Sequence, residues 1–470
     1  MDGIRNIGFQ QVTPGAGQVK PKEAENQQVS DQVSLGGDKT VPEGVHKKWL
    51  FMNYVAADCN LKEYQAANID NQEIVGSDAN THVVAMIDIG PNNTPKGILD
   101  WSGGRTYYVT QDSQLGKINS PVVEEYGDHI NMVDTKTLTK FIVDMMQKFP
   151  SDHVALIMND HGGGWVGAMS DDTDGKGKDF SMPDMKNALA EAEKITGKKI
   201  DIFGFDACLM ADTQAAYEFK DVANFYLAAE ETEGGPGWSY NSMLDGHLEP
   251  KSVSSQMSSA MRLLQDAMNK KINVSPEEFC KIVVKVNEEN QKYIPTFSAI
   301  DLTKMDIVKD ATNGLAEAIL KTDEKEAVRN AIMNAQNYGG GWAPYNDMHD
   351  LGHLAKLIDK GVSDPALKKA AEGVKKAIEQ AVIANEVSPK YSESTGLHIY
   401  APSGGMGADY QELAFAKDTQ WDEAIKSLPA GKESGQAGNM EDFGVEFFNN
   451  AEEFLGPVWP DGTSRKTDRK

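Results

Sequence analysis

The sequence predicts an α/β fold, in which helices cover both faces of a mostly parallel central sheet and a helical extension follows. Residues 154–158 and 202–205 are short apolar runs without alternation, as expected for strands buried on both faces. Residues 183–195 between them have helical spacing. Strand, helix and strand form a unit with a right-handed crossover, so the two strands run parallel. Of the 470 residues, 40% are hydrophobic, which supports a large core.

The first half of the chain alternates strands and helices. Regular structure is expected from about His46, with strand-like runs at 48–55, 82–89, 105–110 and 225–229. The segment 134–148 has one apolar helical face, formed by Leu138, Phe141, Ile142 and Met145. In the helix at 183–195, Pro183 suits the first turn and Gly197 marks the end. This alternation indicates an α/β sandwich.

The second half is mostly helical. One long amphipathic helix is predicted to carry Val253, Met257, Met261, Leu264 and Met268. A strand-like run at 296–302 precedes helix-like segments at 306–320, 323–337 and 364–385. We expect the run 396–401 to return to the main sheet as a late strand, and residues 440–454 to form a docking helix.

Composition excludes several classes of partner. Lys and Arg number 46 against 71 Asp and Glu, so the net charge of −25 argues against binding to nucleic acid or anionic membranes. No apolar stretch approaches the roughly 20 residues that span a bilayer. The three cysteines, at 59, 208 and 280, show no metal-like spacing and do not suit a disulfide framework. We therefore expect a free Cys208.

His161 and Cys208 are the strongest candidates for chemistry. Each follows the end of one apolar strand, in VALIMNDHGGGW at 154–165 and IDIFGFDACLMA at 200–211. If the strands are neighbours about 4.8 Å apart, a thiol and an imidazole base converge beyond their C-terminal ends. Gly162 to Gly164 allow a ligand to approach the backbone closely. Asp206 precedes the cysteine by two residues, which places both side chains on one side of an extended chain.

These motifs resemble the clostripain-like cysteine peptidases, in the clan of caspases, legumain and gingipains. The resemblance rests on DHGGGW at 160–165 and DACLMA at 206–211, with support from MNYVAADCNL at 52–61, from 118–138, from LAAEETEGGPGW at 227–238 and from GLHIYAP at 396–402. It covers about residues 47–405. Cys59 is a departure, because the family more often carries Asn there. The resemblance implies a caspase-like α/β/α sandwich.

The resemblance also implies roles for the matched residues. Cys208 is the expected nucleophile and His161 the base and proton donor of a dyad that forms a thioester acyl-enzyme. The backbone N–H groups of Gly162 and Cys208 are the expected oxyanion hole. The family cleaves after Arg or Lys, which requires a carboxylate at the base of the pocket. Asp206 is the leading candidate, and Glu230 and Glu231 are further candidates after the strand run at 225–229.

Four parts of the chain follow from these patterns. Residues 1–44 are a flexible leader or pro-segment, 45–250 the caspase-like catalytic core, 251–430 a mostly helical region that returns a strand to the sheet, and 431–470 a docking helix with a disordered tail. The long polar loop at 165–182 carries Lys176 and Lys178, both candidates for self-cleavage. We expect a monomer, which self-cleavage would convert into two associated chains.

Cofactor and location are less constrained. The chemistry requires no cofactor or metal, but the acidic clusters at 171–174 and 230–233 are candidates for binding calcium, on which some relatives depend. The substrates expected are peptides or proteins with basic residues. Family members are usually exported, and the first residues, MDGIRNIGFQQV, contain no hydrophobic secretory core. A secreted, periplasmic or cell-surface protein is expected, with an intracellular exception left open.

Two other functions compete with a cysteine peptidase. The first is a non-catalytic binding protein that keeps the fold, which the intact His161, Gly162 and Cys208 argue against. The second is a metallohydrolase that uses His349 and His353, four residues apart in YNDMHDLGHL. The Glu of a zincin motif is missing there, and Gly352 weakens a helix.

Overall fold

A computed structural model describes residues 41–91, 101–114, 116–235, 237–238, 256–339 and 347–430. Of the leader expected at 1–44, only residues 41–44 are described, and the docking helix expected at 440–454 lies outside the described residues. The four-part division of the chain therefore stays a prediction at both ends.

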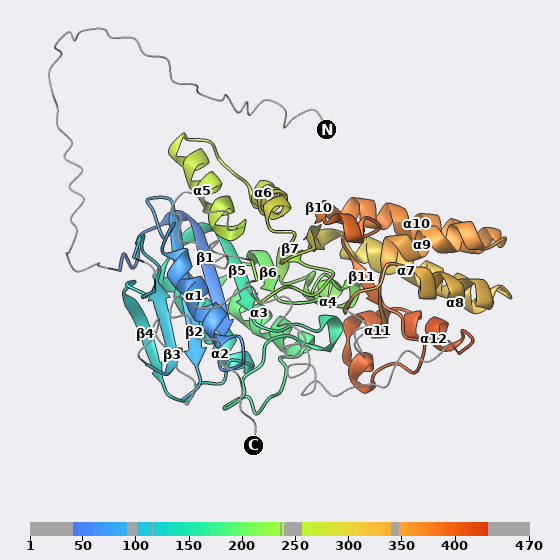
Figure 1. Cartoon of the computed structure of the whole chain (residues 1–470), viewed down its shortest axis with the longest axis horizontal. Coiled ribbons are helices and arrows are strands. Elements are labelled where there is room, and N and C mark those ends of the chain that lie inside the picture. Colours follow the sequence, from blue (N-terminus) through green and yellow to red (C-terminus); the bar gives the residue numbers. More distant parts are fainter. Residues whose placement is uncertain are drawn as a thin grey trace, which may run out of the picture. The chain divides into compact units, whose positions relative to one another are not determined.

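A sheet of nine strands forms the centre of the fold (Figure 1). Its order is β10-β8-β7-β6-β5-β1-β2-β3-β4. The bounds are β1 Lys47–Ala56, β2 Thr81–Ile89, β3 Gly103–Tyr108, β4 Val122–Gly127, β5 Ser151–Asn159, β6 Ile200–Asp206, β7 Ala223–Ala228, β8 Thr296–Asp301 and β10 Val382–Val387. Strands β2, β1, β5, β6 and β7 are parallel, and antiparallel strands extend both sides. The predicted mostly parallel sheet is confirmed.

Helices cover both faces of this sheet. They are α1 Lys62–Gln72, α2 Thr135–Lys148, α3 Met182–Thr196, α4 Thr213–Phe219, α5 Gln256–Asn269 and α6 Pro276–Val286. Alternate residues of β1 enter two separate cores: Leu50 and Met52 pack with α2 and α3, whereas Trp49 and Phe51 pack with α1, α5 and α6. Because successive strand residues point to opposite faces, this division shows the predicted α/β/α sandwich.

The C-terminal region is helical and adds a small second sheet. Its helices are α7 Met305–Lys321, α8 Lys325–Asn334, α9 Leu351–Gly361, α10 Pro365–Ala381, α11 Ala414–Asp418 and α12 Trp421–Lys426. Strands β9 (Met348–Asp350) and β11 (His398–Tyr400) pair antiparallel in the two-stranded sheet. In Figure 1, α7 to α10 gather beside the edge of the main sheet that ends in β10.

The expectation that residues 396–401 return to the main sheet is wrong. Those residues supply β11, which pairs with β9, and the strand that returns is β10. The spacing predicts a helix over 364–385, but α10 ends at Ala381 and the next residues form β10. The apolar spacing Val374, Ile378 and Val382 continues across this boundary, so periodicity alone does not show where the helix stops.

Candidate active site

His161 and Cys208 lie beyond the ends of two neighbouring strands. Strands β5 and β6 pair in parallel with Asn159 opposite Asp206, so each candidate follows its strand end by two residues. The two segments touch: a Cβ added to Gly162 would lie 2.4 Å from the Cys208 carbonyl oxygen. His161 and Cys208 line the same cavity, as the spacing in the sequence predicts.

Four segments of the chain form the walls of this cavity. They contribute Leu61, Gln65 and Asn68; Asn159, Asp160 and His161; Asp206, Ala207 and Cys208; and Glu233, Gly234, Gly235 and Gly237. The first set comes from α1 and the residue before it, an element that sequence periodicity did not predict. The cavity therefore brings together a thiol, an imidazole and several carboxyl groups.

The Cys208 thiol is buried against the backbone of Glu233. Its sulfur accepts a hydrogen bond from the Glu233 N–H at 3.2 Å, and its own S–H faces the Glu233 carbonyl at 3.6 Å. Burial raises the pKa of Cys208 to about 12, and the neighbouring carboxylates act in the same direction. An uncharged thiol at neutral pH needs a base to become a nucleophile.

A strained turn presents Cys208 to the cavity. Leu209, the next residue, has a φ of 63°, a left-handed conformation that costs a non-glycine residue about 1 kcal/mol. The Leu209 N–H donates to the Glu231 carbonyl at 3.2 Å, and His398 Nε2 donates to the Leu209 carbonyl at 2.8 Å. His398 is buried in β11 and its backbone N–H bonds Ala211. The GLHIYAP motif thus supports the turn that carries the nucleophile.

Asn60 holds the imidazole of His161. Nε2 donates to the Asn60 side-chain oxygen at 2.7 Å, which leaves Nδ1 as the basic nitrogen. Among the described residues, no hydrogen bond joins this imidazole to the Cys208 thiol. Catalytic hydrogen bonds often tighten only when substrate is bound, so this resting geometry is compatible with a base role for His161.

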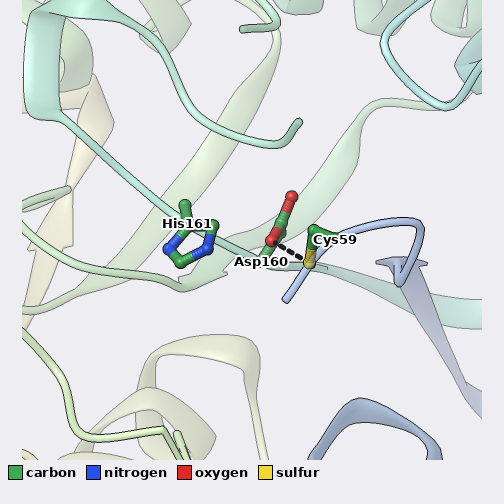
Figure 2. Close-up of side chains that lie close together, drawn as sticks. All are labelled: Cys59, Asp160 and His161. Atoms are coloured by element: carbon green, nitrogen blue, oxygen red, sulfur yellow. Dashed lines mark hydrogen bonds between the residues drawn. The ribbon is translucent and has the colours of Figure 1, made fainter. Parts of the chain in front are cut away.

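Asp160 anchors the segment that carries His161. This buried carboxylate accepts the Ser170 N–H at 2.6 Å, and its other oxygen faces the Cys59 thiol at 3.1 Å, as Figure 2 shows. Cys59 lies in the loop after β1, so the contact joins the ends of β1 and β5. Sequence reasoning noted Cys59 only as a departure from the family pattern and missed this contact.

A pair of buried carboxyl groups lies beside the nucleophile. Asp206 accepts the Trp238 N–H at 2.8 Å and the Asn159 side-chain amide at 2.5 Å. Burial raises the pKa of Asp206 to about 7. Burial and the adjacent Asp206 raise the pKa of Glu233 well above its usual range, as expected for two carboxyl groups that share one proton. Both groups line the cavity.

Glu230 and Glu231 serve other contacts. Glu230 accepts the Gly396 N–H at 3.2 Å, and Glu231 accepts the N–H groups of Thr232 and Gly339 at 2.7 and 2.9 Å. Neither residue lines the cavity. The sequence predicts that Glu230 or Glu231 lies in the substrate pocket. In the structure, Glu233 is the acidic residue after β7 that lines the cavity. The Gly234-Gly235 pair that follows it was the available signal, because it marks a close approach of backbone.

In the part of the chain that the structure describes, two backbone N–H groups next to His161 and Cys208 lack a protein acceptor. Among the described residues, neither the Gly162 N–H nor the Cys208 N–H donates a hydrogen bond to another protein group. The neighbouring N–H groups of Gly163 and Leu209 are both bonded, at 2.9 and 3.2 Å. Unpaired donors beside a nucleophile are suited to stabilising an oxyanion.

His349 and His353 do not form the helical pair that the metallohydrolase hypothesis requires. His349 lies in β9 and His353 in the first turn of α9, so the two do not share a helix face. His353 Nδ1 accepts the Gln336 N–H at 2.9 Å, and burial lowers the pKa of His349 to about 4. Within the described ranges, neither residue belongs to a group of potential metal ligands.

The chain is similar to several known proteins. The model of the Clostripain family matches residues 53–428. Clostripain of Hathewaya histolytica is 24% identical over 406 residues, which cover 76% of this chain and 75% of that protein. A secreted C11 cysteine protease of Bacteroides thetaiotaomicron, iotapain, has a TM-score of 0.57 at 14% identity and covers 80% of this chain and 100% of its own. An inactive zymogen C11 protease of Parabacteroides distasonis has a TM-score of 0.54 at 18% identity, with 79% and 97% covered.

The helices of the described residues are too short or too polar to span a bilayer.

Proposed function

This chain belongs to the clostripain family and is a cysteine peptidase, and on that premise we propose that it cleaves peptide bonds after Arg or Lys through Cys208 and His161. The observation that carries the proposal is one cavity that holds a thiol, an imidazole and a buried carboxyl pair. A guanidinium or ammonium group needs a charged partner when it is buried, and Asp206 with Glu233 supplies one.

The reaction follows from these groups. The basic nitrogen of His161 takes the Cys208 proton, and the thiolate attacks the substrate carbonyl carbon. The N–H groups of Gly162 and Cys208 stabilise the oxygen that becomes negative. His161 returns the proton to the leaving amine, which yields a thioester. Water, deprotonated by His161, then hydrolyses the thioester and restores the thiol.

A panel of fluorogenic peptides that differ only before the cut tests this function. Arg and Lys peptides should be cleaved, and matched Asp and Asn peptides should be cleaved at least 100-fold more slowly. With an Asp or Asn peptide, the carboxylate of the pocket has no cationic partner. This costs a few kcal/mol of transition-state stabilisation, which gives the expected ratio of rates. Equal rates on all four peptides, or no cleavage of any, would contradict the proposal.

Self-cleavage in the loop between His161 and Cys208 is part of the proposed activity. Lys176 and Lys178 are exposed at the tip of a loop that the bridge between Ala168 and Phe180 closes. We expect active protein to become two chains after long incubation, with a new end after Lys176 or Lys178. The parallel strands β5 and β6 should keep the pieces together. The neighbour from Parabacteroides distasonis is described as an inactive zymogen, which supports a processing step in this fold.

Mass spectrometry of active protein over time tests the cut. Cys208→Ala protein is the control and should remain a single chain. An intact loop in fully active wild-type protein would end this proposal, as would a cut loop in Cys208→Ala protein purified without other proteases.

We also propose that a calcium ion binds to the carboxylates of Asp58, Asp88 and Asp171. These three carboxylates are at most 2% exposed, and their ligand atoms lie within 4.8 Å of one another. One oxygen each of Asp58 and Asp88 is buried without a hydrogen-bond partner. Burial, followed by the like charges of Asp171 and Asp58, raises the pKa of Asp88 to about 8. Oxygen ligands of this kind suit calcium, so the residues fit the ion.

These three proposed calcium ligands agree only partly with the acidic clusters at 171–174 and 230–233 that the sequence predicts. Asp171 belongs to the acidic cluster at 171–174, but Asp58 and Asp88 come from the ends of β1 and β2. In the cluster at 230–233, Glu230 and Glu231 bind backbone N–H groups instead. The ion would hold the loop at 171–175, whose Asp171 already accepts the N–H groups of Asp174 and Gly175.

Calcium should stabilise the fold through this cluster. Without the ion, the free energy of unfolding should fall as the pH rises from 4 to 8, because folded Asp88 retains a proton that the unfolded chain releases. We expect saturating calcium to raise the melting temperature by several degrees at pH 8. Asp88→Asn should remove most of this rise. Asp172→Asn, an exposed neighbour in the same loop, is the control and should keep it. An unchanged wild-type melting temperature would contradict the site.

We also propose that this protein is exported from the cell, because iotapain is described as a secreted protease.

A further inference from the structure

We propose that Cys59, Asp160 and His161 form a Zn²⁺ site beside the nucleophile, and that zinc bound there inhibits the peptidase. The three residues lie together in Figure 2, at the ends of β1 and β5. Their ligand atoms are within 4.8 Å of one another. The site itself needs no catalytic activity, whereas inhibition rests on the proposed role of His161 as the base.

The three ligand types match zinc. A thiolate, an imidazole and a carboxylate are ligands that Zn²⁺ binds with tetrahedral geometry, at roughly 2.0 to 2.3 Å. Tetrahedral ligands at such distances are separated by about 3.5 Å. The Cys59 sulfur and the Asp160 oxygen are already 3.1 Å apart. Shifts of about 1 Å at His161 would complete the set, and water would take the fourth position.

The surroundings of Cys59 and Asp160 hold these two ligands in position. The Leu61 N–H donates to the Cys59 sulfur at 3.4 Å, which holds the sulfur in place. The second oxygen of Asp160 accepts both the N–H and the hydroxyl of Ser170, so its carboxylate is held in place. Such contacts around the ligands orient them and raise affinity.

An ion can reach the site through the substrate cavity. Asp160 and His161 both line that cavity, and His161 is partly exposed. Cys59 is only 3% exposed and lies behind them. Rotation of the Asn60 side chain, which is exposed, would release His161 Nε2 from its present hydrogen bond.

Binding is a replacement of a proton by a metal ion. The Cys59 S–H now donates to Asp160; on binding, this proton leaves to solvent and the sulfur lone pair forms the zinc–sulfur bond. His161 binds through Nε2, whose ring proton moves to Nδ1, so Nε2 has a free lone pair for the ion and Nδ1 can no longer accept a proton. An imidazole that coordinates zinc through one nitrogen and is fixed by the ion is not free to accept the Cys208 proton, so turnover stops.

Direct metal binding is measured on Cys208→Ala protein, which lacks the catalytic thiol. Co²⁺ replaces zinc as the probe, because thiolate coordination gives it a near-ultraviolet charge-transfer band. We expect this band to saturate at one Co²⁺ per chain and to disappear when Zn²⁺ is added. Cys59→Ser in the same background should abolish the band. Cys280→Ser, another buried cysteine far along the chain in α6, should leave it unchanged.

Inhibition is measured on protein with Cys208 intact. Cys59→Ser should retain wild-type activity within about twofold and need at least tenfold more zinc for half-inhibition. Cys280→Ser should respond as wild type does. Melting curves establish that each variant is folded, with Cys59→Ala as the substitute if the serine variant is not. A cobalt band that survives loss of Cys59, or equal zinc inhibition of wild type and a folded Cys59 variant, would overturn the proposal. A Cys59-dependent band in a chain without peptidase activity would retain the site and refute the proposed function.

Discussion

Replacing Cys208 by Ala should abolish turnover and leave the protein folded. Loss of a nucleophile from a catalytic dyad typically lowers kcat by about 10⁴-fold to 10⁶-fold. Among the described residues, the Cys208 thiol makes two weak hydrogen bonds, both with the Glu233 backbone, so the melting temperature should change by a few degrees at most. His161→Ala should have a similar effect on kcat, because the buried thiol, with a pKa of about 12, stays protonated without a base.

Peptidase assays and melting curves on the same preparations provide the measurement. Cys280→Ser is the matched control, since it removes a buried thiol in the core formed by α6 and should keep wild-type activity. Near-wild-type turnover by a clean Cys208→Ala preparation would refute the dyad. Loss of turnover together with loss of the fold would assign Cys208 a structural role instead.

Asp206→Asn should reduce kcat/KM for Arg and Lys substrates by about 100-fold or more, the second largest effect that we expect. The change removes the charge that faces the substrate's basic group. Glu233→Gln should also lower kcat/KM, because the two carboxyl groups share the negative charge of the pocket. Neither variant should lose its residual activity on uncharged substrates.

The pH profile separates a specificity role from a structural one. Burial raises the pKa of Asp206 to about 7, so the pocket loses negative charge as the pH falls through neutrality. For wild type, kcat/KM on an Arg substrate should fall below pH 7 more steeply than on an uncharged substrate. The difference between the two profiles should vanish in Asp206→Asn. If the variant keeps its full rate on Arg peptides, another group binds the cation. If the Asp206→Asn variant unfolds, the main role of Asp206 is to stabilise the fold through its hydrogen bonds with Asn159 and Trp238.

The central sheet and the two reacting groups were predictable because their signals are local. The runs at 154–158 and 202–205 are continuous and apolar, so they identify buried parallel strands without knowledge of their partners. The residues that follow such strands meet at one edge of the sheet. His161, Asp206 and Cys208 could therefore be placed together from the sequence.

The rest of the site depends on contacts between distant segments. Glu233, and not Glu230 or Glu231, lies beside Asp206, because backbone hydrogen bonds from Ala211 and Leu209 hold residues 229–231 along the nucleophile turn. Helix α1 was missed because its residues have almost no amphipathic pattern and seven of its eleven are buried. Helix α6, in contrast, begins with a capping box of Ser275 and Glu278, a signal that is present in the sequence.

The support that His398 gives to the nucleophile turn constrains the order of events during synthesis. The hydrogen bond from His398 to the Leu209 carbonyl joins residues 189 positions apart. The ribosome therefore completes both strands that carry His161 and Cys208 long before the residue that braces the turn has emerged. At roughly 5 to 20 residues per second, this interval lasts on the order of ten seconds or more. A nascent chain would thus remain a poor protease until most of its C-terminal region is made, which protects it and its neighbours from premature cleavage.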